Sequence, residues 1–455
     1  MLYDAEKGEI TAALGGDLNL SRGLAVYREA RFLQVRDLLR GADVGFMNLE
    51  SSVHRYGDGT PTIKAGPYIT TEPHITEDIK WMGINLLSCA NNHCYDFGEE
   101  GVVISNHYLD EAGITHAGTG RNLREAASPA YRDTANGRVA LVAATSMFPE
   151  WYPAKNQRVD MPGKPGVNPL GFQTTYVLPP EAWQGLRAVG RGLPFDADRE
   201  RVRAFGFFTP AQTGTSSDTE YTFLGRRFIP GDRFAVQTKV NERDAEENLR
   251  QIREARRQAD LVIFSLHNHE MGGPTLWTAK SRDEMDRPAD FVFDFAHRAF
   301  DEGADIFVCH GPHVPLGIEM YKGKPLFCSL GNFCMQYESA RFLPAHAYES
   351  WGLDPMSTPA DFFDALTDQN RRAHAGDPLN WQTVLAVCRF GQGKLADLAL
   401  YPLDLGYGRS RSQRGRPLLA DPEMGEQILA RIARLSADLG TKVELRDGRG
   451  VVTVG

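Results

Sequence analysis

The sequence contains little cysteine and no long apolar run. Six cysteines in 455 residues are too few for a disulfide scaffold, so we expect free thiols in a reducing compartment. No stretch of about 18 apolar residues occurs, which leaves no candidate for a transmembrane helix. The opening residues MLYDAEKGEITAAL lack the positive and apolar regions of a secretory signal. We therefore expect a cytoplasmic protein without a membrane anchor.

An excess of positive charge is also absent. The chain has 59 acidic and 50 basic residues and a net charge of −9, so we expect no nucleic-acid partner. Hydrophobic residues make up 42% and charged residues 24%, which is typical of globular proteins and excludes a disordered or fibrous chain. The 45 glycines and 26 prolines predict many loops, where functional residues tend to lie. The composition does not indicate an oligomeric state.

Short apolar runs alternate with helix-like segments along the chain, and this alternation predicts an α/β fold. The expected buried strands are Thr11–Leu14, Val44–Leu49, Ile84–Cys89, Val139–Ala144, Leu261–Leu266, Ile306–Cys309 and Leu326–Leu330. The expected helices are Ala25–Leu39, Glu72–Met82, Glu99–Ala112, Arg243–Gln258 and Arg282–Glu302.

Two aromatic, proline- and glycine-rich segments interrupt this alternation. Residues 147–235 and 336–382 are both too long for ordinary connections, which usually run to about half a dozen residues. Each is either a lid over a site or a packed excursion. We interpret 147–235 as an insertion, 336–382 as a possible lid insertion and 383–455 as a C-terminal segment that completes one domain spanning 1–455.

Polar side chains follow six of the predicted strands. They are Asp17 and Asn19, Glu50, Asn92 with His93 and Asp96, His267 with His269, His310 with His313, and Asn332. The carboxyl ends of strands border the ligand crevice in open α/β sheets, so these side chains can converge. Carboxylate, amide and imidazole groups are ligands for Mn, Fe, Zn or Mg, and this set is large enough for two adjacent ions that activate a water.

Each of these residues has an ordinary structural interpretation when taken singly. A lone Asp after a strand is usually a turn or cap residue, and a lone His is usually a hydrogen-bonding group. The recurrence of such residues after six separate strands is poorly explained in this way and favours a metal site.

The motifs that carry these residues resemble a known family. They are GGDLNLSRG at 15–23, NLE at 48–50, ANNHCYDFG at 90–98, AGTGRNLREA at 117–126, SLHNHE at 265–270, HGPHVPLGIEMYKGKPLFCSLGNF at 310–333 and LYPLDL at 400–405. In this order they resemble the CapA family of bacterial capsule (poly-γ-glutamate) biosynthesis proteins, which is similar to the calcineurin-like metallophosphoesterases. The resemblance implies a two-sheet β-sandwich flanked by helices, with metals at the strand ends.

The resemblance also implies roles for the site residues. Asp17 would ligate one metal, Glu50 would bridge two, Asn92 and His267 would ligate the second, and His313 would close the site. His93 would donate a proton to the leaving group or bind the developing oxyanion, and Asp96 is the second catalytic candidate. The resemblance implies two divalent ions, of Mn, Fe or Zn.

The sequence departs from the phosphoesterase pattern at three places. Asn19 stands where a histidine is usual, His310 and His313 are separated by one residue more than usual, and His269 is an additional candidate ligand. These departures leave open the number of metals and whether His269 or His310 ligates.

Two functions follow from this interpretation. The first is a cytoplasmic metal-dependent hydrolase, in which a metal-activated water attacks an amide (γ-glutamyl or peptide-like) or a phosphoester bond. Arg158, Lys164, Arg409 and Arg411 are candidates to bind its small or peptide-like anionic substrate, although they are equally typical of solvated charged loops. The second is a non-catalytic or accessory role in the synthesis or export of poly-γ-glutamate or capsule.

Overall fold

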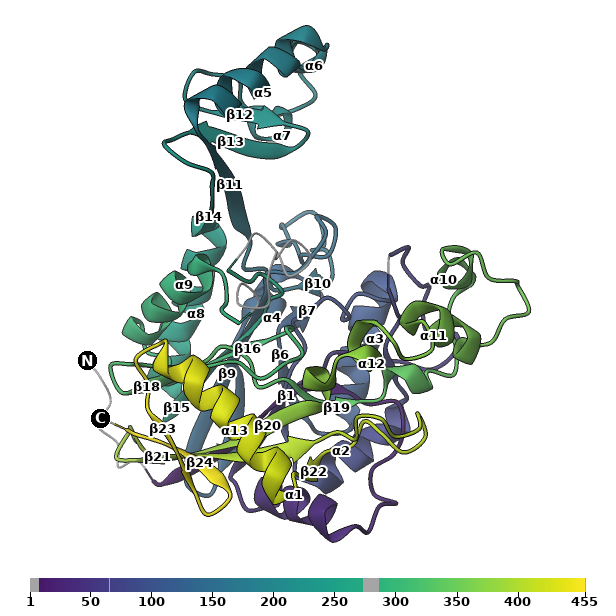
Figure 1. The fold of residues 1–455 in the computed structure, drawn as a ribbon, viewed down its shortest axis with the longest axis vertical. Coiled ribbons are helices and arrows are strands. Elements are labelled where there is room, and N and C mark those ends of the chain that lie inside the picture. Colours follow the sequence, from purple (N-terminus) through teal and green to yellow (C-terminus); the bar gives the residue numbers. More distant parts are fainter. Residues whose placement is uncertain (1–7, 65, 273–285, 455) are drawn as a thin grey trace. The chain divides into compact units, whose positions relative to one another are not determined.

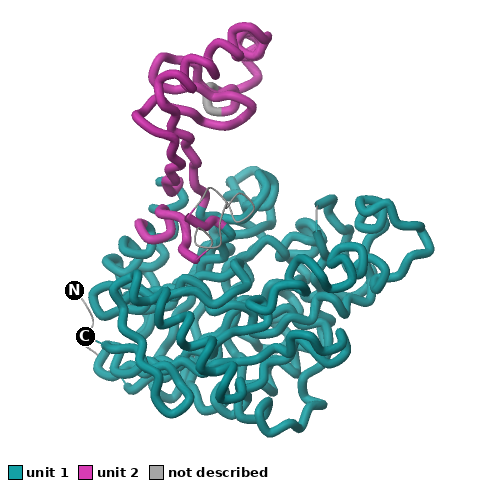
Figure 2. Tube along the Cα trace, viewed as in Figure 1, with its two compact units in different colours: residues 1–170, 242–269, 295–455 teal, residues 171–241, 270–294 magenta. Residues whose placement is uncertain are grey.

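The computed structural model describes residues 8–64, 66–272 and 286–454 (Figure 1). The chain divides into two compact units (Figure 2). Unit 1 consists of residues 1–170, 242–269 and 295–455, and unit 2 consists of residues 171–241 and 270–294. All the candidate metal ligands belong to unit 1.

The larger sheet of unit 1 has ten strands. Its main path runs through β23 (Val443–Arg446), β24 (Arg449–Val452), β21 (Lys394–Asp404), β20 (Gln382–Gly391), β1 (Ile10–Asn19), β2 (Val44–Asn48), β5 (Leu86–Ser88) and β6 (Thr115–Ala117). Two further strands pair with this path, β19 (Asn332–Met335) with β1 and β22 (Leu418–Leu419) with β21. β1, β2, β5, β6 and β19 are parallel, whereas β20 is antiparallel to β1.

The smaller sheet of unit 1 has six strands. Their order is β17 (Ile318–Tyr321), β18 (Lys324–Phe327), β16 (Ile306–His310), β15 (Leu261–His267), β9 (Gly137–Thr145) and β8 (Ala130–Thr134). β9, β15, β16 and β18 are parallel, and β8 and β9 form a hairpin. Short pairs lie outside the two sheets, β3 (Ser52–Val53) with β4 (Thr70–Thr71) and β7 (Thr119–Gly120) with β10 (Gly166–Val167).

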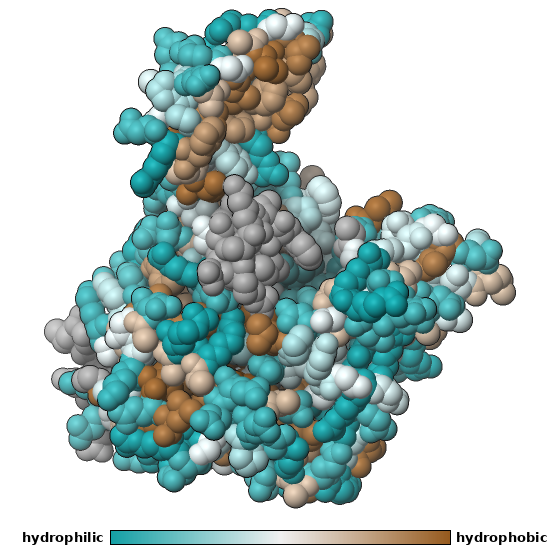
Figure 3. Space-filling model, in the orientation of Figure 1, coloured by the Kyte–Doolittle hydropathy of each residue, from teal (hydrophilic) through white to brown (hydrophobic). Residues whose placement is uncertain are grey.

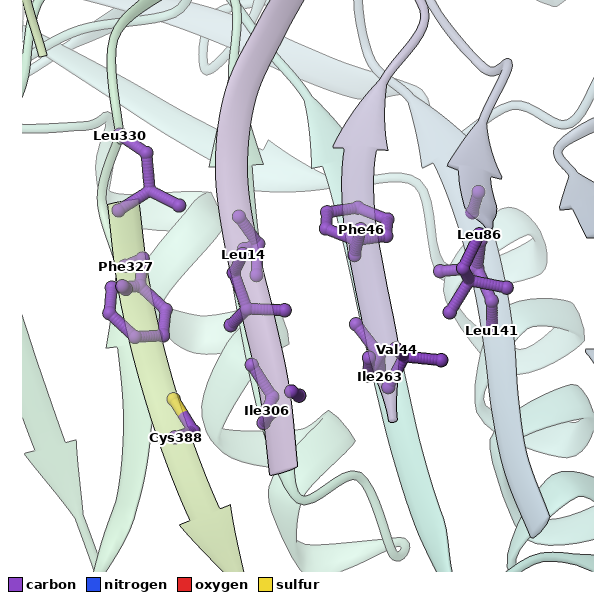
Figure 4. Close-up of a cluster of buried hydrophobic side chains, with 14 of the residues drawn as sticks. Leu14, Val44, Phe46, Leu86, Leu141, Ile263, Ile306, Phe327, Leu330 and Cys388 are labelled. Atoms are coloured by element: carbon purple, nitrogen blue, oxygen red, sulfur yellow. The ribbon is translucent and has the colours of Figure 1, made fainter. Parts of the chain in front are cut away.

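The main hydrophobic core lies between the two sheets (Figure 4). Leu14, Phe46 and Leu86 of the larger sheet pack in one cluster with Ile263 and Ile306 of the smaller sheet. Alternate residues of the same strands, such as Ala13 and Met47, point the other way, as the two-residue period of a strand requires. The arrangement is a two-sheet sandwich, which confirms the predicted fold class.

Helices cover the outer faces of the sandwich. Phe32, Val35 and Leu39 of α1 (Ala30–Arg40) and Ile79 and Met82 of α2 (Thr76–Met82) pack on the larger sheet. α3 (Gly98–Glu111) adds Leu109 to that cluster. On the smaller sheet, α8 (Glu242–Gln258) buries Leu249 and Ile252, and Phe295 of α9 (Asp290–Asp301) packs against Phe264 of β15. α13 (Pro422–Ala437) contributes Ile428 and Ile432 to the main core, and the short α4 (Leu123–Ala127) follows β7.

The segment 336–382 forms a small cluster of its own. It contains α10 (Ala345–Glu349), α11 (Pro359–Thr367), α12 (Ala373–Gly376) and short 3₁₀ turns at Pro378–Trp381 and Tyr337–Ser339. Phe362, Phe363 and Trp381 pack there with Tyr68 and Phe97. A capping box at Thr358 fixes the start of α11.

Unit 2 is a four-stranded sheet with three helices. The strand order is β12 (Tyr221–Phe223), β13 (Arg226–Pro230), β11 (Phe172–Leu178) and β14 (Ala235–Val240). The helices are α5 (Pro180–Gly192), α6 (Phe195–Ala204) and α7 (Pro210–Thr213). Large apolar side chains are exposed in this unit, namely Leu193, Phe205, Phe207, Phe208, Leu224 and Phe234. Figure 3 shows brown, hydrophobic atoms gathered over its helices.

Some local boundaries differ from the sequence-based expectation. The helix expected from Ala25 begins at Ala30, because the backbone amides of Leu24 and Ala25 both donate to Asp78 Oδ1 and hold this stretch outside the helix. The strand expected at Leu326–Leu330 ends at Phe327, and the chain then crosses to the larger sheet as β19. The helix expected at Arg282–Glu302 is observed as α9, and residues 282–285 lie outside the described residues.

All six cysteines are buried and none forms a disulfide, as expected. In the described part of the chain, no helix combines the length and the apolar character needed to cross a membrane.

Candidate metal centre

The register of the parallel strands brings polar side chains from both sheets to one edge of the sandwich. Asp17 on β1 lies opposite Asn48 on β2 and Asn332 on β19. His267 on β15 lies opposite His310 on β16 in the smaller sheet. Since the strands end together, the side chains at their carboxyl ends converge, as in other sheets of parallel strands.

One cluster is formed by Asp17, Glu50 and His313, which are all buried and each offer a ligand atom to a common point. Asp17 Oδ2 lies 3.2 Å from His313 Nδ1. Glu50 Oε1 lies 3.7 Å from His313 Nε2. These separations place a carboxylate pair and one imidazole around a space that suits a cation with oxygen and nitrogen ligands.

The second cluster is formed by Glu50, His267 and His269. His267 Nε2 lies 3.8 Å from Glu50 Oε1 and 3.1 Å from His269 Nε2. Glu50 is the member common to both clusters, and its Oε1 faces both His267 and His313. It therefore occupies the position of a bridging carboxylate between two metal sites.

Several buried lone pairs around these clusters have no hydrogen-bond partner among the described residues. These atoms are Glu50 Oε1, Asn19 Oδ1, Asn92 Oδ1, His269 Nδ1 and both ring nitrogens of His310. Buried polar atoms are normally satisfied, so such a concentration requires an explanation. A divalent cation with N and O ligands supplies one, and the donor set therefore fits the metals that the family resemblance implies.

The pKa values of the carboxylates and of His313 point the same way. Burial raises the pKa of Glu50 to about 8, against the opposing positive charge of His313. Burial acts to lower the pKa of His313, but the charges of Glu50 and Asp17 outweigh it and raise that pKa to about 9. Burial also acts to raise the pKa of Asp17, but the hydrogen bond and charge of His313 lower it below its ordinary value. The cluster thus retains protons near neutral pH that a cation would displace.

The remaining histidines of the centre are neutral. Burial and the charge of His313 lower the pKa of His269 to about 3. Burial lowers the pKa of His310 to about 4 and that of His267 well below its ordinary value. Neutral imidazoles keep a free lone pair, which is the form that binds metals.

Two asparagines orient the ligands and were not among the predicted ligands. Asn48 Nδ2 lies 2.8 Å from Asp17 Oδ1, to which it donates, and 3.2 Å from His267 Nδ1. Asn332 Oδ1 lies 2.9 Å from His313 Nδ1. Asn48 is the last residue of β2, and Asn332 is the first residue of β19, where it lies opposite Asp17.

The backbone between β16 and β18 is held in an unusual conformation next to the centre. Gly311 has φ of 106°, and a Cβ there would lie 2.7 Å from the carbonyl oxygen of Asn268. Its amide donates to Asp17 Oδ2 over 3.2 Å. His313 itself has φ of 59°, a left-handed conformation that non-glycine residues adopt only when the surroundings impose it. Glycine at 311 thus lets the chain turn closely enough to aim His313 at Asp17.

A cluster of His93, Asp96 and Lys64 lies beside the centre. His93 Nδ1 lies 2.9 Å from Asp96 Oδ2 and 3.0 Å from Lys64 Nζ, and Lys64 also forms an ion pair with Asp96. Burial lowers the pKa of His93, and the charge of Lys64 acts in the same direction, while Asp96 opposes both. Burial acts to raise the pKa of Asp96, but Lys64 and His93 lower it below its ordinary value. Lys64 belongs to no recognisable motif and was not predicted from the sequence.

The two asparagines of the ANNH motif have different surroundings. Asn91 is fully buried and is used structurally, because its side chain donates to Leu49 O over 2.8 Å and accepts from the amide of His93 over 3.0 Å. Asn92 Oδ1 is buried and lacks a partner in the described residues. Asn19 Nδ2 donates to Glu50 Oε2 over 3.1 Å, so only its Oδ1 is left for another ligand.

A histidine from the segment 336–382 also reaches the centre. The ring of His374 on α12 lies 4.6 Å from that of His313, measured between centroids. Burial lowers the pKa of His374 well below its ordinary value, and the charges of His313 and His269 act in the same direction. It was missed in the sequence because it follows no strand.

The four predicted anion-binding residues lie in ion pairs of the protein. Arg158 lies 3.0 Å from Asp160, and Lys164 lies 3.5 Å from Glu99. Arg409 lies 3.8 Å from Asp404, and Arg411 lies 2.8 Å from Asp364.

Comparison with protein-family models identifies the chain. The model described as bacterial capsule synthesis protein PGA_cap matches residues 11–337, a range that includes both clusters. The chain belongs to the PGA_cap family. This confirms the resemblance to the CapA proteins.

Related PGA_cap-like sequences come from several bacteria. The uncharacterized proteins y4uA and y4sH of Sinorhizobium fredii are each 34% identical over 448 residues, which cover 96% of this chain and 91% of those proteins. The PGA biosynthesis protein CapA of Bacillus subtilis is 30% identical over 154 residues, which cover 33% of this chain and 35% of that protein.

Solved structures match this PGA_cap protein at low sequence identity and low TM-score. A phosphatase of Mycoplasma pneumoniae has a TM-score of 0.35 and 11% identity, covering 88% of this chain and 94% of that one. A hypothetical protein of Thermus thermophilus has a TM-score of 0.36 and 13% identity, covering 87% and 99%. Both TM-scores are low, so family membership rests on the sequence matches.

Proposed function

We propose that the protein is a metal-dependent hydrolase that acts on a small or peptide-like anionic substrate. The observation that carries this proposal is the position of Glu50, whose Oε1 faces His313 at 3.7 Å and His267 at 3.8 Å. A buried carboxylate between two ligand clusters is the arrangement required for a pair of divalent ions. None of the six cysteines forms a disulfide, which fits a reducing compartment, so we place this activity in the cytoplasm.

The chain supplies ligands for both ions. Asp17 and His313 would hold one ion and His267 and His269 the other, with Glu50 shared. Asn92, Asn19 and His310 offer further buried lone pairs. When bound, a pair of divalent ions such as Mn, Fe or Zn supplies Lewis acidity and activates water.

His93 would handle the proton. When its Nδ1–H donates to Asp96, the ring orientation is fixed and Nε2 is the atom that exchanges a proton with the leaving group. Lys64 keeps Asp96 ionised through the ion pair between them. Nothing in this arrangement distinguishes an amide from a phosphoester bond, because both reactions need an activated water and an acid for the leaving group.

Metal analysis and a hydrolysis panel test the proposal. The purified protein is assayed for bound metal and for turnover of bis-p-nitrophenyl phosphate and of γ-glutamyl-p-nitroanilide, each with Mn²⁺, Zn²⁺ or EDTA. We expect activity on one substrate that requires the metal and is lost in folded Asp17→Ala and His93→Ala variants. His107→Ala is the matched control, because His107 is exposed on α3. Absence of metal binding, or activity that ignores both substitutions, would contradict the proposal.

The names of some relatives favour a second candidate, an accessory role in capsule or poly-γ-glutamate production. One relative of Mycobacterium tuberculosis is named a probable polyglutamine synthesis accessory protein and is 23% identical over 296 residues, covering 65% of this chain and 56% of that protein. A deletion strain of the source bacterium, complemented with the wild-type gene or the His267→Ala gene, distinguishes the two roles. Full restoration of an extracellular polymer by the variant would favour the accessory role.

A further inference from the structure

The position of His374 sets it apart from the other histidines of the centre. Its ring packs against His313 at 4.6 Å and meets Tyr337 edge-on at 6.0 Å, measured between centroids. It belongs to neither ligand cluster. Its ring nitrogens make no hydrogen bond with any residue in 8–64, 66–272 or 286–454. The ring of His374 thus lies next to His313, a ligand of the proposed metal site, and its own donor and acceptor are unused within the described residues. It can therefore contact a molecule that binds at the centre.

Groups of the metal centre act electrostatically on this ring. The largest such effects after burial come from His313 and His269, which both lower the pKa of His374, whereas Asp17 opposes them. Asp17 and Glu50 already hold His313 between them. The two carboxylates thus contact the nitrogens of His313, whereas His374 contacts its ring.

The chain that carries His374 is strained. Asp368, Gln369 and Asn370 have φ of 47°, 54° and 69°, and Ala373 has φ of 54°. Left-handed backbone is unfavourable for residues other than glycine, less so for Asp and Asn, and it persists where the surroundings impose it, commonly at functional sites. Four such residues within six positions make this turn costly to maintain.

Buried contacts hold the strained turn in place. Arg414 donates from Nη2 to Asn370 Oδ1 over 2.7 Å and from Nε to Glu338 Oε2 over 2.8 Å. The indole of Trp381 donates to the backbone oxygen of His374 over 2.9 Å. Arg414, Glu338 and Trp381 are all buried. These contacts fix the backbone of residues 370–374 and leave the His374 ring free.

We propose that His374 is a substrate-contacting residue of the metal centre, and that its imidazole hydrogen-bonds an oxygen of the substrate next to the bond that is cleaved. The ligand it serves is an oxyanion, either a phosphate group or the carboxylate and carbonyl oxygens of a γ-glutamyl group. This inference rests on the proposed hydrolase function. It assigns the segment 336–382 a role in substrate binding through a single side chain.

Calorimetry separates this role from metal binding. Mn²⁺ alone is titrated into metal-free wild-type, His374→Ala, His374→Gln and His107→Ala proteins, and inorganic phosphate or L-glutamate is then titrated into the Mn²⁺-loaded forms. We expect equal Mn²⁺ affinity in all four and an affinity for one of the anions that is about tenfold lower in His374→Ala, as the loss of one hydrogen bond predicts. His374→Gln keeps a donor and should recover part of the loss, and His107→Ala should match the wild type.

Three results would overturn the inference, and they differ from failure of the hydrolase proposal. Unchanged anion affinity in Mn²⁺-loaded His374→Ala would show that the ring does not contact the ligand. Loss of Mn²⁺ affinity in both His374 variants would make His374 a metal ligand instead. A loaded wild-type protein that binds neither anion would also overturn it. A wild-type protein that binds no Mn²⁺ would contradict the hydrolase proposal itself, and this inference with it.

Discussion

His267 Nε2 and His269 Nε2 lie 3.1 Å apart, with both rings buried. Burial and neighbouring positive charge keep both imidazoles neutral. Two neutral nitrogens that face each other, with Glu50 Oε1 3.8 Å from the first, can share a single cation.

Replacement of one of these two histidines should weaken one metal site and leave the other intact. We expect His269→Ala to weaken binding of one of two Mn²⁺ ions by more than the roughly 10- to 100-fold that loss of an outer hydrogen bond causes. Isothermal titration calorimetry and metal analysis would report the stoichiometry. Two undisturbed sites in this variant would contradict the assignment, and His107→Ala serves as the control.

Metal affinity should depend on pH. Metal-free Glu50 has a pKa of about 8 and His313 one of about 9, and both must lose a proton before they can ligate. Protons therefore compete with the metal below these values, so affinity should rise as the pH increases through 8 and level off above 9. Titrations in buffers with different ionisation enthalpies would count the protons released, and equal heats in all buffers would argue against this model.

The Asp96–His93 contact should affect turnover more than metal binding. We expect His93→Ala to lower kcat roughly 10²- to 10⁴-fold, the range for loss of a general acid. Asp96→Asn should lower kcat by less, because the ring remains but loses its fixed orientation. Both variants should keep the wild-type metal content, and a loss of metal in either would assign that residue to the metal site.

The buried ion pair that supports the segment 336–382 should be important for stability. Arg414→Ala leaves the buried Glu338 with the longer contact to Arg411 at 3.9 Å, and breaking a buried pair costs about 3–5 kcal/mol. Arg158→Ala removes an exposed pair with Asp160 and should cost less than about 1 kcal/mol. Urea denaturation of the two variants gives the comparison, and similar costs would contradict the structural role of Arg414.

The strain of the turn before His374 can be measured directly. Gln369 is exposed and has φ of 54°, so glycine removes the left-handed penalty without loss of a buried contact. The greater freedom of glycine in the unfolded chain offsets part of the gain, and we expect Gln369→Gly to stabilise the protein by about 0.5–1 kcal/mol. Gln369→Ala retains the penalty and should leave the melting temperature unchanged, and a lower melting temperature for the glycine variant would disprove the strain.

Much of the fold and part of the centre follow from sequence patterns. The apolar runs around Leu14, Phe46 and Ile263 locate the buried strands, and the end of each run indicates where its strand ends. The residues at those ends, including Asp17 and His267, therefore meet. This logic depends only on local pattern and on parallel strands sharing an edge.

Lys64 and His374 could not be predicted in this way. Both lie in loops, and their positions depend on contacts with residues distant in sequence, such as Asp96 for Lys64 and Trp381 for the backbone of His374. Local patterns contain no information on which loop folds over which edge.

The metal centre takes its ligands from both sheets, and this has a consequence for how the protein unfolds. Glu50 follows β2 of the larger sheet, whereas His267 ends β15 of the smaller one. A cation bound by both residues would link the two sheets. Its binding free energy would add to the stability of the folded state, by an amount that depends on the free metal concentration. The melting temperature should then rise with added Mn²⁺ and fall with chelator. When the metal is removed, the two sheets should separate first at this edge.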